Sequence, residues 1–192
     1  MNPNKLAKLK DIVCLIVESQ GVIAKTRLLK LLFIIDRESV NRFGHKVTGL
    51  DYRVWKMGPV QYDVFENLSN CNGSFFSDYL TIKYDNDRCH LARGKFESPK
   101  ENLSSKEIEL IISVVHKNSA VFTNDLIDDL HGPGSLWRSE AEENGVYEQL
   151  ESGIISTTNI EINFEKLVSD NPLLLGIYAD SIEQEEIESL LS

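Results

Sequence analysis

The segment Thr26–Arg37 (TRLLKLLFIIDR) limits the possible folds most strongly, because it predicts a helix that is apolar around nearly its whole circumference. Its charged residues are Arg27, Lys30, Asp36 and Arg37. A helix of this kind is normally buried on several sides, so other elements must surround it. The spacing of Arg27, Lys30 and Arg37 places these cations on one helix face, where they are candidate partner-binding residues.

A second informative stretch, Trp55–Val60 (WKMGPV), follows some twenty residues later. Trp55 is expected to be a buried core residue, since large aromatic side chains supply much of a core's apolar area. Gly58 permits backbone angles that other residues avoid, and Pro59 stops a strand or opens a helix. We therefore expect this corner to fold a helix over 60–68 back onto the central helix.

Apolar spacing along the rest of the chain predicts a mainly α (α+β) fold, a compact helical domain with a small β-hairpin or sheet. Further helices are expected over 3–20, from 104, from 123 and over 135–144. A hairpin is expected over 79–96, lying on helices or joining 51–56, and weak β character is expected over 146–162. The predicted domains are a helical domain over 1–145 and an acidic C-terminal extension over 146–192, which packs on it or binds a partner.

Three helix starts carry capping signals. Ser104 and Glu107 have the spacing of a capping box, in which side chain and backbone satisfy each other's hydrogen bonds. Thr123 is a candidate N-cap, because its hydroxyl can accept from a backbone amide of the first turn. Ser181 and Gln184 repeat the capping-box spacing, which predicts a last acidic helix starting there.

Charge is distributed unevenly along the chain, whose formal net charge is −10. Residues 1–60 carry 11 Lys and Arg against 5 Asp and Glu, whereas residues 125–192 carry 2 against 16. The acidic part could attract a basic partner, or it could serve solubility alone.

No run of 18 apolar residues or signal-peptide pattern is present, so no membrane association and a cytoplasmic location are expected. The three cysteines lack framework spacing, which favours reduced thiols.

The sequence offers little evidence of catalysis, and we expect neither an enzyme nor a cofactor. Phosphate-binding glycine motifs and zinc-ligand spacings are missing, so no metal is expected either. His131 beside Asp128 and Asp129 could form an oriented base of a divergent hydrolase, but no nucleophile accompanies it. A position at a helix C-terminus, where an imidazolium or a hydrogen bond to a carbonyl is favoured, explains His131 more simply.

A winged-helix DNA-binding regulator is an alternative. In that reading the helices over 3–20 and 26–41 form the helical pair, and the hairpin over 79–96 forms the wing. A recognition helix needs an exposed polar face, however, and Thr26–Arg37 is mostly Leu, Phe and Ile. Nucleic acid is therefore the less favoured partner.

Taken together, these motifs resemble the Panacea domain of SocA-like antitoxins over roughly residues 5–140. The resemblance is carried by the central helix, the W-x-x-G-P-V stretch, the capped helix at Ser104 and a loose match at Leu130–Pro133 and Trp137. The matching residues are Leu28, Lys30, Leu31, Leu32, Trp55, Gly58, Pro59 and Val60.

The resemblance implies a phage-associated or type II-like toxin–antitoxin module. Its antitoxin would neutralise a cognate toxin by direct protein binding. In the SocA case the antitoxin also acts as a proteolytic adaptor for a Clp-type AAA+ protease. His131 and Trp137 join Arg27, Lys30 and Arg37 as possible partner-binding residues.

Overall fold

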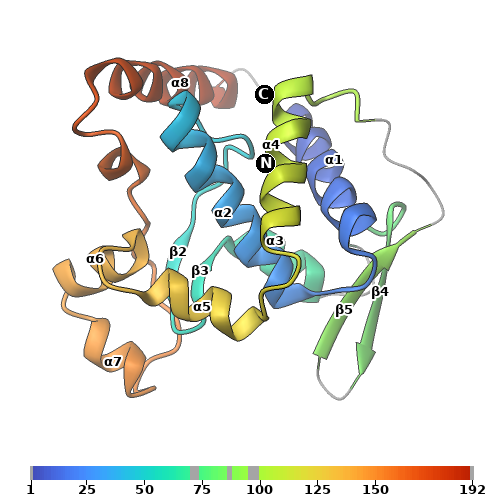
Figure 1. The fold of residues 1–192 in the computed structure, drawn as a ribbon, viewed down its shortest axis with the longest axis horizontal. Helices are drawn as coiled ribbons and strands as arrows, with labels where there is room; N and C mark the ends of the chain where they lie inside the picture. Colours follow the sequence, from blue (N-terminus) through green and yellow to red (C-terminus); the bar gives the residue numbers. More distant parts are fainter. Residues whose placement is uncertain (1, 70–73, 86–87, 95–99, 191–192) are drawn as a thin grey trace.

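The protein is described by a computed structural model covering residues 2–69, 74–85, 88–94 and 100–190 (Figure 1). Over these ranges it is mainly α with a small antiparallel β part, which confirms the predicted fold class. In chain order the elements are α1 (Pro3–Gln20), β1 (Ile23–Ala24), α2 (Lys25–Phe43), β2 (Arg53–Trp55), β3 (Gly58–Val60), α3 (Tyr62–Ser69), β4 (Leu80–Asp85), β5 (Arg88–Arg93), α4 (Ser105–Lys117), α5 (Thr123–His131), α6 (Leu136–Glu143), α7 (Tyr147–Glu151), the 3-10 helix η1 (Phe164–Leu167) and α8 (Pro172–Leu190).

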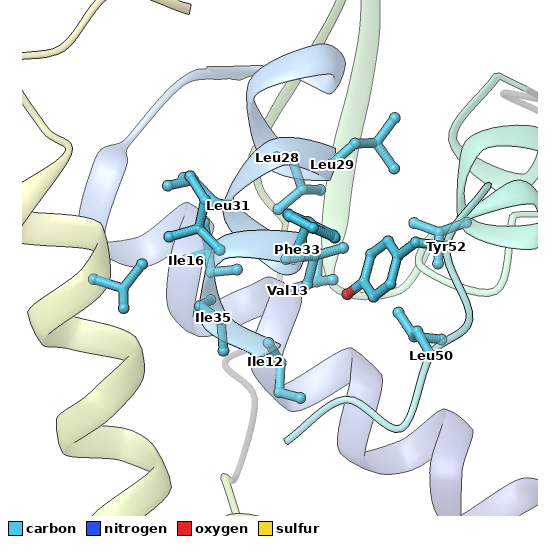
Figure 2. Close-up of a cluster of buried hydrophobic side chains, with 14 of the residues drawn as sticks. Ile12, Val13, Ile16, Leu28, Leu29, Leu31, Phe33, Ile35, Leu50 and Tyr52 are labelled. Carbon is cyan, nitrogen blue, oxygen red and sulfur yellow. The ribbon is translucent and has the colours of Figure 1, made fainter. Parts of the chain in front are cut away.

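Helix α2 is the central element of the fold. It packs against α3, α4, α5, α8, β3 and η1, and runs through the middle of the view in Figure 1. Leu28, Leu31 and Leu32 are completely buried. Figure 2 shows Leu28, Leu31 and Phe33 gathered with side chains of α1 and with Tyr52. The predicted burial of the apolar helix is therefore confirmed.

The ends of the first helices agree with the sequence signals. Asn2 caps α1, its side chain accepting from the amide of Asn4 at 2.8 Å, with Pro3 as the first helical residue. Gly44 ends α2 with a φ of 75°, a left-handed angle that costs glycine little. The capping box at the start of α4 is present in both directions.

Two other predicted caps are wrong. In α5 the N-cap position belongs to Phe122, with no side-chain hydrogen bond, and Thr123 is already helical. Ser181 lies in the middle of α8, where its hydroxyl donates to a carbonyl three residues earlier. Helix α8 starts at Pro172 instead, because the side chain of Asn171 accepts a first-turn amide and proline suits the first helical position.

The strands form two small antiparallel sheets. In the first, the order is β1-β5-β4, so the predicted hairpin is extended by Ile23–Ala24 and does not join 51–56. In the second, β2 pairs with β3, which places Pro59 in a strand and delays the next helix to Tyr62. Residues 86–87, inside the predicted hairpin, and Cys71 lie outside the described residues, while Cys14 and Cys89 are buried.

The chain beyond residue 145 lies against the rest of the molecule. Residues 147–151 are helical, contrary to the predicted β character, because their backbone carbonyls accept hydrogen bonds from amides a few residues later in the chain. The following segment runs along β2, where the Val54 amide donates to Ile160 and the Ile162 amide donates to Tyr52. Helix α8 then packs on α2. The domain boundary at 145 stays a prediction.

A buried carboxylate holds the loop that leads into β2. The Asp36 carboxylate accepts from the Thr48 amide at 2.9 Å and from the Tyr52 hydroxyl at 2.8 Å. Burial raises the pKa of Asp36, although these hydrogen bonds and the charge of Lys46 oppose the rise. The side chain therefore ties α2 to the start of the β2–β3 hairpin.

No helix within the described ranges is long and apolar enough to cross a membrane.

Candidate functional site

Lys30, which the spacing placed on one helix face with Arg27 and Arg37, lies inside the molecule. Its side chain is 1% exposed, and its Nζ donates to the carbonyl of Pro59 at 2.9 Å. Burial lowers the pKa of Lys30 to about 7, because a desolvated amine holds its proton less strongly. The burial of α2 thus extends to Lys30, a basic residue within its apolar segment.

Gly58 makes the approach of Lys30 possible. Its φ is 87°, a left-handed angle that side chains rarely adopt. A β-carbon placed on Gly58 would lie 3.0 Å from Lys30 Nζ and 3.4 Å from His131 Nε2. The glycine of the W-x-x-G-P-V stretch therefore brings an amine from α2 and an imidazole from α5 to the same side of the hairpin.

His131, the last residue of α5, completes this arrangement. Its ring stacks on Trp137 with centroids 3.7 Å apart, and its Nδ1 lies 3.7 Å from a carboxylate oxygen of Glu151. Its Nε2 is buried and has no hydrogen-bond partner in the described parts of the chain. Burial, and then the charge of Lys30, lower the pKa of His131 to about 4, so of the two expected roles at this helix end the imidazolium is not present at neutral pH.

The two tryptophans differ in burial, and the one expected in the core is the more exposed. Trp137 is completely buried, and its indole nitrogen donates to the carbonyl of Trp55 at 2.9 Å. Trp55 is only half-buried, which corrects its assignment as a core residue. Its indole nitrogen donates to the carbonyl of Thr158 at 3.1 Å, and its ring packs edge-on against Phe65.

Two of the three arginines of α2, Arg27 and Arg37, face α4 and α5. The Arg27 guanidinium donates to the carbonyls of Asn118 and Val121, and so ties α2 to the loop between α4 and α5. Arg37 remains partly exposed, 3.7 Å from the carboxylate of Asp129. Asp129 thus lies near Arg37 of α2, whereas the alternative reading had paired it with His131 as an oriented base.

We call Lys30, Gly58, Pro59, His131 and Trp137 the Lys30 cluster. Its members come from α2, the β2–β3 hairpin, α5 and α6. Lys30 donates to the carbonyl of Pro59, Gly58 lies against Lys30 and His131, and His131 stacks on Trp137. The cluster joins a desolvated amine to a neutral imidazole, but its buried amine offers no open substrate position. Among the described residues, no group of three or more His, Cys, Asp or Glu is placed to hold a metal ion.

Sequence reasoning missed two parts of this site. Glu151 comes within reach of His131 only because α7 folds back after α6, and no local motif marks it. Thr158 reaches Trp55 through the segment that runs beside β2. Both contacts span large sequence distances, so only tertiary structure reveals them.

Open clefts lie elsewhere on the molecule. A cleft of about 560 Å³ separates the start of α1 from α8 and contains the Lys5–Glu185 ion pair at 3.2 Å. A smaller groove of about 300 Å³ between α2, α4 and α5 is lined by Arg37 and Asp129, among others. Both mix charges of opposite sign, and neither reaches the Lys30 cluster.

Comparison with known proteins gives one family match. The model of the antitoxin SocA-like, Panacea domain matches residues 28–138, more than half of the chain. This range contains every member of the Lys30 cluster and ends at the residue after Trp137. The chain has no match among curated proteins or among solved structures.

Proposed function

Because the chain belongs to the SocA-like antitoxin family defined by the Panacea domain, we propose that it neutralises a cognate toxin by binding it directly. The observation that carries the proposal is the family match over residues 28–138. The same range contains the residues that fix α2 and α6 to the β2–β3 hairpin. A rigid frame of this kind is what a binding protein needs, since preorganisation reduces the entropic cost of association.

We also propose that the protein works without catalysing a reaction. Its most strongly perturbed amine, that of Lys30, is 1% exposed and donates to a backbone carbonyl. A nucleophile or general base must come within hydrogen-bond reach of a substrate, which this position does not offer. The same burial argues against α2 as a DNA-recognition helix, because Lys30 would have to reach a base edge or a phosphate.

The acidic C-terminal part supports a basic toxin as the partner. Residues 125–192 carry 2 Lys and Arg against 16 Asp and Glu, and many of these carboxylates are exposed. Complementary charge speeds encounter between proteins, and salt screens this effect. Association with the toxin should therefore slow as ionic strength rises.

The test is co-expression with the product of the neighbouring gene. That product should arrest growth alone, and growth should return when the full antitoxin chain is co-expressed. Purified toxin and antitoxin should form a complex whose association rate falls between low and high salt. The proposed function would be refuted if the neighbouring gene product is harmless alone, or if the toxin does not bind the antitoxin and its growth arrest persists on co-expression.

Delivery of the bound toxin to a Clp-type AAA+ protease is a further part of the proposal, supported by the family alone. In a purified system with the protease and ATP, toxin should be degraded faster when the antitoxin is present. Equal toxin half-lives with and without antitoxin would remove the adaptor role and leave direct neutralisation standing.

A further inference from the structure

Three large apolar side chains are exposed around the turn of the β2–β3 hairpin. Met57 in the turn is 51% exposed, Tyr62 at the start of α3 is 41% exposed, and Ile154 after α7 is 76% exposed. We call these three residues the tip surface. Isolated exposed apolar residues are ordinary, but a group of them on a rigid support is typical of a protein interface.

Contacts between the three segments place the tip surface in one region. The Trp55 and Tyr62 rings lie 6.2 Å apart, which joins the hairpin to α3. The Lys56 amide donates to the Ser156 carbonyl at 2.9 Å, which joins the turn to the segment carrying Ile154. Figure 1 likewise shows the β2–β3 turn beside the chain that follows α7.

The support beneath the tip surface is the Lys30 cluster. The residue that follows Met57 is Gly58, which lies against Lys30 and His131. Trp137 binds the carbonyl of Trp55 at the other end of the turn. The turn is therefore held from inside on both of its arms, and little ordering remains to be done when a partner binds.

Around this turn the carboxylates of Glu151, Glu161 and Asp63 outnumber the cations, which are the exposed Lys56 in the turn and Arg53 in β2. Glu151 lies beside His131, and Glu161 pairs with β2 through a bridge to Arg53. Asp63 adjoins Tyr62 in α3 and is exposed. The nearby cation of Arg53 is engaged over the Tyr62 ring, 5.2 Å from its centroid. A partner that fits would present an apolar contact surrounded by basic residues.

From this we infer that the tip surface is where the toxin docks, with a basic, apolar-centred face of the toxin covering Met57, Tyr62 and Ile154. The inference rests on the proposed function, since it names the surface through which neutralisation takes place. A central apolar contact within a charged rim is also the arrangement in which a few side chains carry most of the binding free energy.

The test compares aspartate substitutions at matched exposed positions in the full-length protein. Met57→Asp and Ile154→Asp should each weaken toxin binding by at least about tenfold and reduce growth rescue. The matched control is Phe122→Asp, since Phe122 is 78% exposed and lies between α4 and α5. Its affinity should stay within about twofold of the unsubstituted chain. Melting temperatures of the free variants establish that all three are folded, and Ile154→Leu should restore binding.

The outcomes separate the two proposals. If the unsubstituted chain neither binds nor neutralises the toxin, the proposed function fails. If it does both, and Met57→Asp and Ile154→Asp bind as tightly as Phe122→Asp, toxin docking at the tip surface is refuted while neutralisation stands. Loss of binding in Phe122→Asp alone would place the toxin on another surface and refute the inference equally.

Discussion

The buried amine of Lys30 predicts how the stability of the protein depends on pH. In the folded chain its pKa is lowered to about 7, whereas an amine in the unfolded chain titrates near 10.5. Between these values the unfolded state binds the proton more strongly, so protonation favours unfolding. The free energy of unfolding should therefore rise with pH from about 7, and the Lys30 penalty should vanish only above the unfolded pKa.

The size of this effect follows from the difference between the two pKa values. Each pH unit between them changes the free energy of unfolding by about 1.4 kcal/mol. Between pH 7 and 9 the gain is therefore on the order of 2 kcal/mol, since the folded amine is only partly deprotonated at the lower limit. An effect of this size is a large fraction of the stability of a typical domain.

The assay is urea unfolding of the wild-type chain and of Lys30→Met at pH 7, 8 and 9. Methionine keeps the length of the side chain and removes the titrating group. The stability of wild type minus that of the variant should therefore increase by about 2 kcal/mol across the range. Cys14, whose pKa burial raises to about 12, affects both proteins alike and cancels in the difference.

Lys56→Met serves as the matched control, because Lys56 is exposed and lies in the turn next to the same cluster. This variant should show the same pH dependence as wild type. If Lys30→Met also keeps the wild-type pH dependence, the amine is not desolvated in the folded state, and the account of the Lys30 cluster given above is refuted.

Three further predictions concern the same cluster. Gly58→Ala should destabilise the fold by about 1–3 kcal/mol in urea unfolding, because alanine is strained at a φ of 87° and its methyl group would crowd Lys30. Trp137→Phe should cost about 1 kcal/mol by the same measurement, through loss of the hydrogen bond to Trp55, and Trp137→Ala about 3–5 kcal/mol. His131 should make stability fall as pH drops from 6.5 toward its folded pKa of about 4, and thermal melting of His131→Phe should show a smaller loss over that range.

The burial of α2 could be predicted because its sequence leaves hardly any polar face. The position of Lys30 could not, since its spacing from Arg27 and Arg37 is that of a shared surface line. Each of these cations has a different partner. Arg27 donates to carbonyls between α4 and α5, Lys30 donates to a carbonyl of β3, and Arg37 lies near the carboxylate of Asp129. Helical periodicity gives the direction of a side chain, and only the tertiary fold gives what lies there.

Local signals marked some helix starts correctly and failed at others. The capping-box spacing of Ser181 and Gln184 lies inside α8, so this spacing alone does not mark a helix start. The capping box at Ser104 has both of its partners and was found as predicted. At Thr123 the hydroxyl was the whole signal, and the helix begins with a different cap. Residues 147–151 show the same limit, since a short helix without a cap has little sequence signature.

The two proposals together divide the molecule into a frame and an added surface. The frame, which contains the Lys30 cluster, lies within the family match at 28–138. Ile154 and Glu151 lie beyond that match, on a segment held to β2 by backbone hydrogen bonds from Val54 and Lys56. Backbone bonds of this kind depend little on side-chain identity, so substitutions at exposed positions of 152–161 can change the docking surface without loosening the frame. If the toxin docks at the tip surface, the choice of toxin should therefore depend more on residues 152–161 than on the motif residues that support the tip surface.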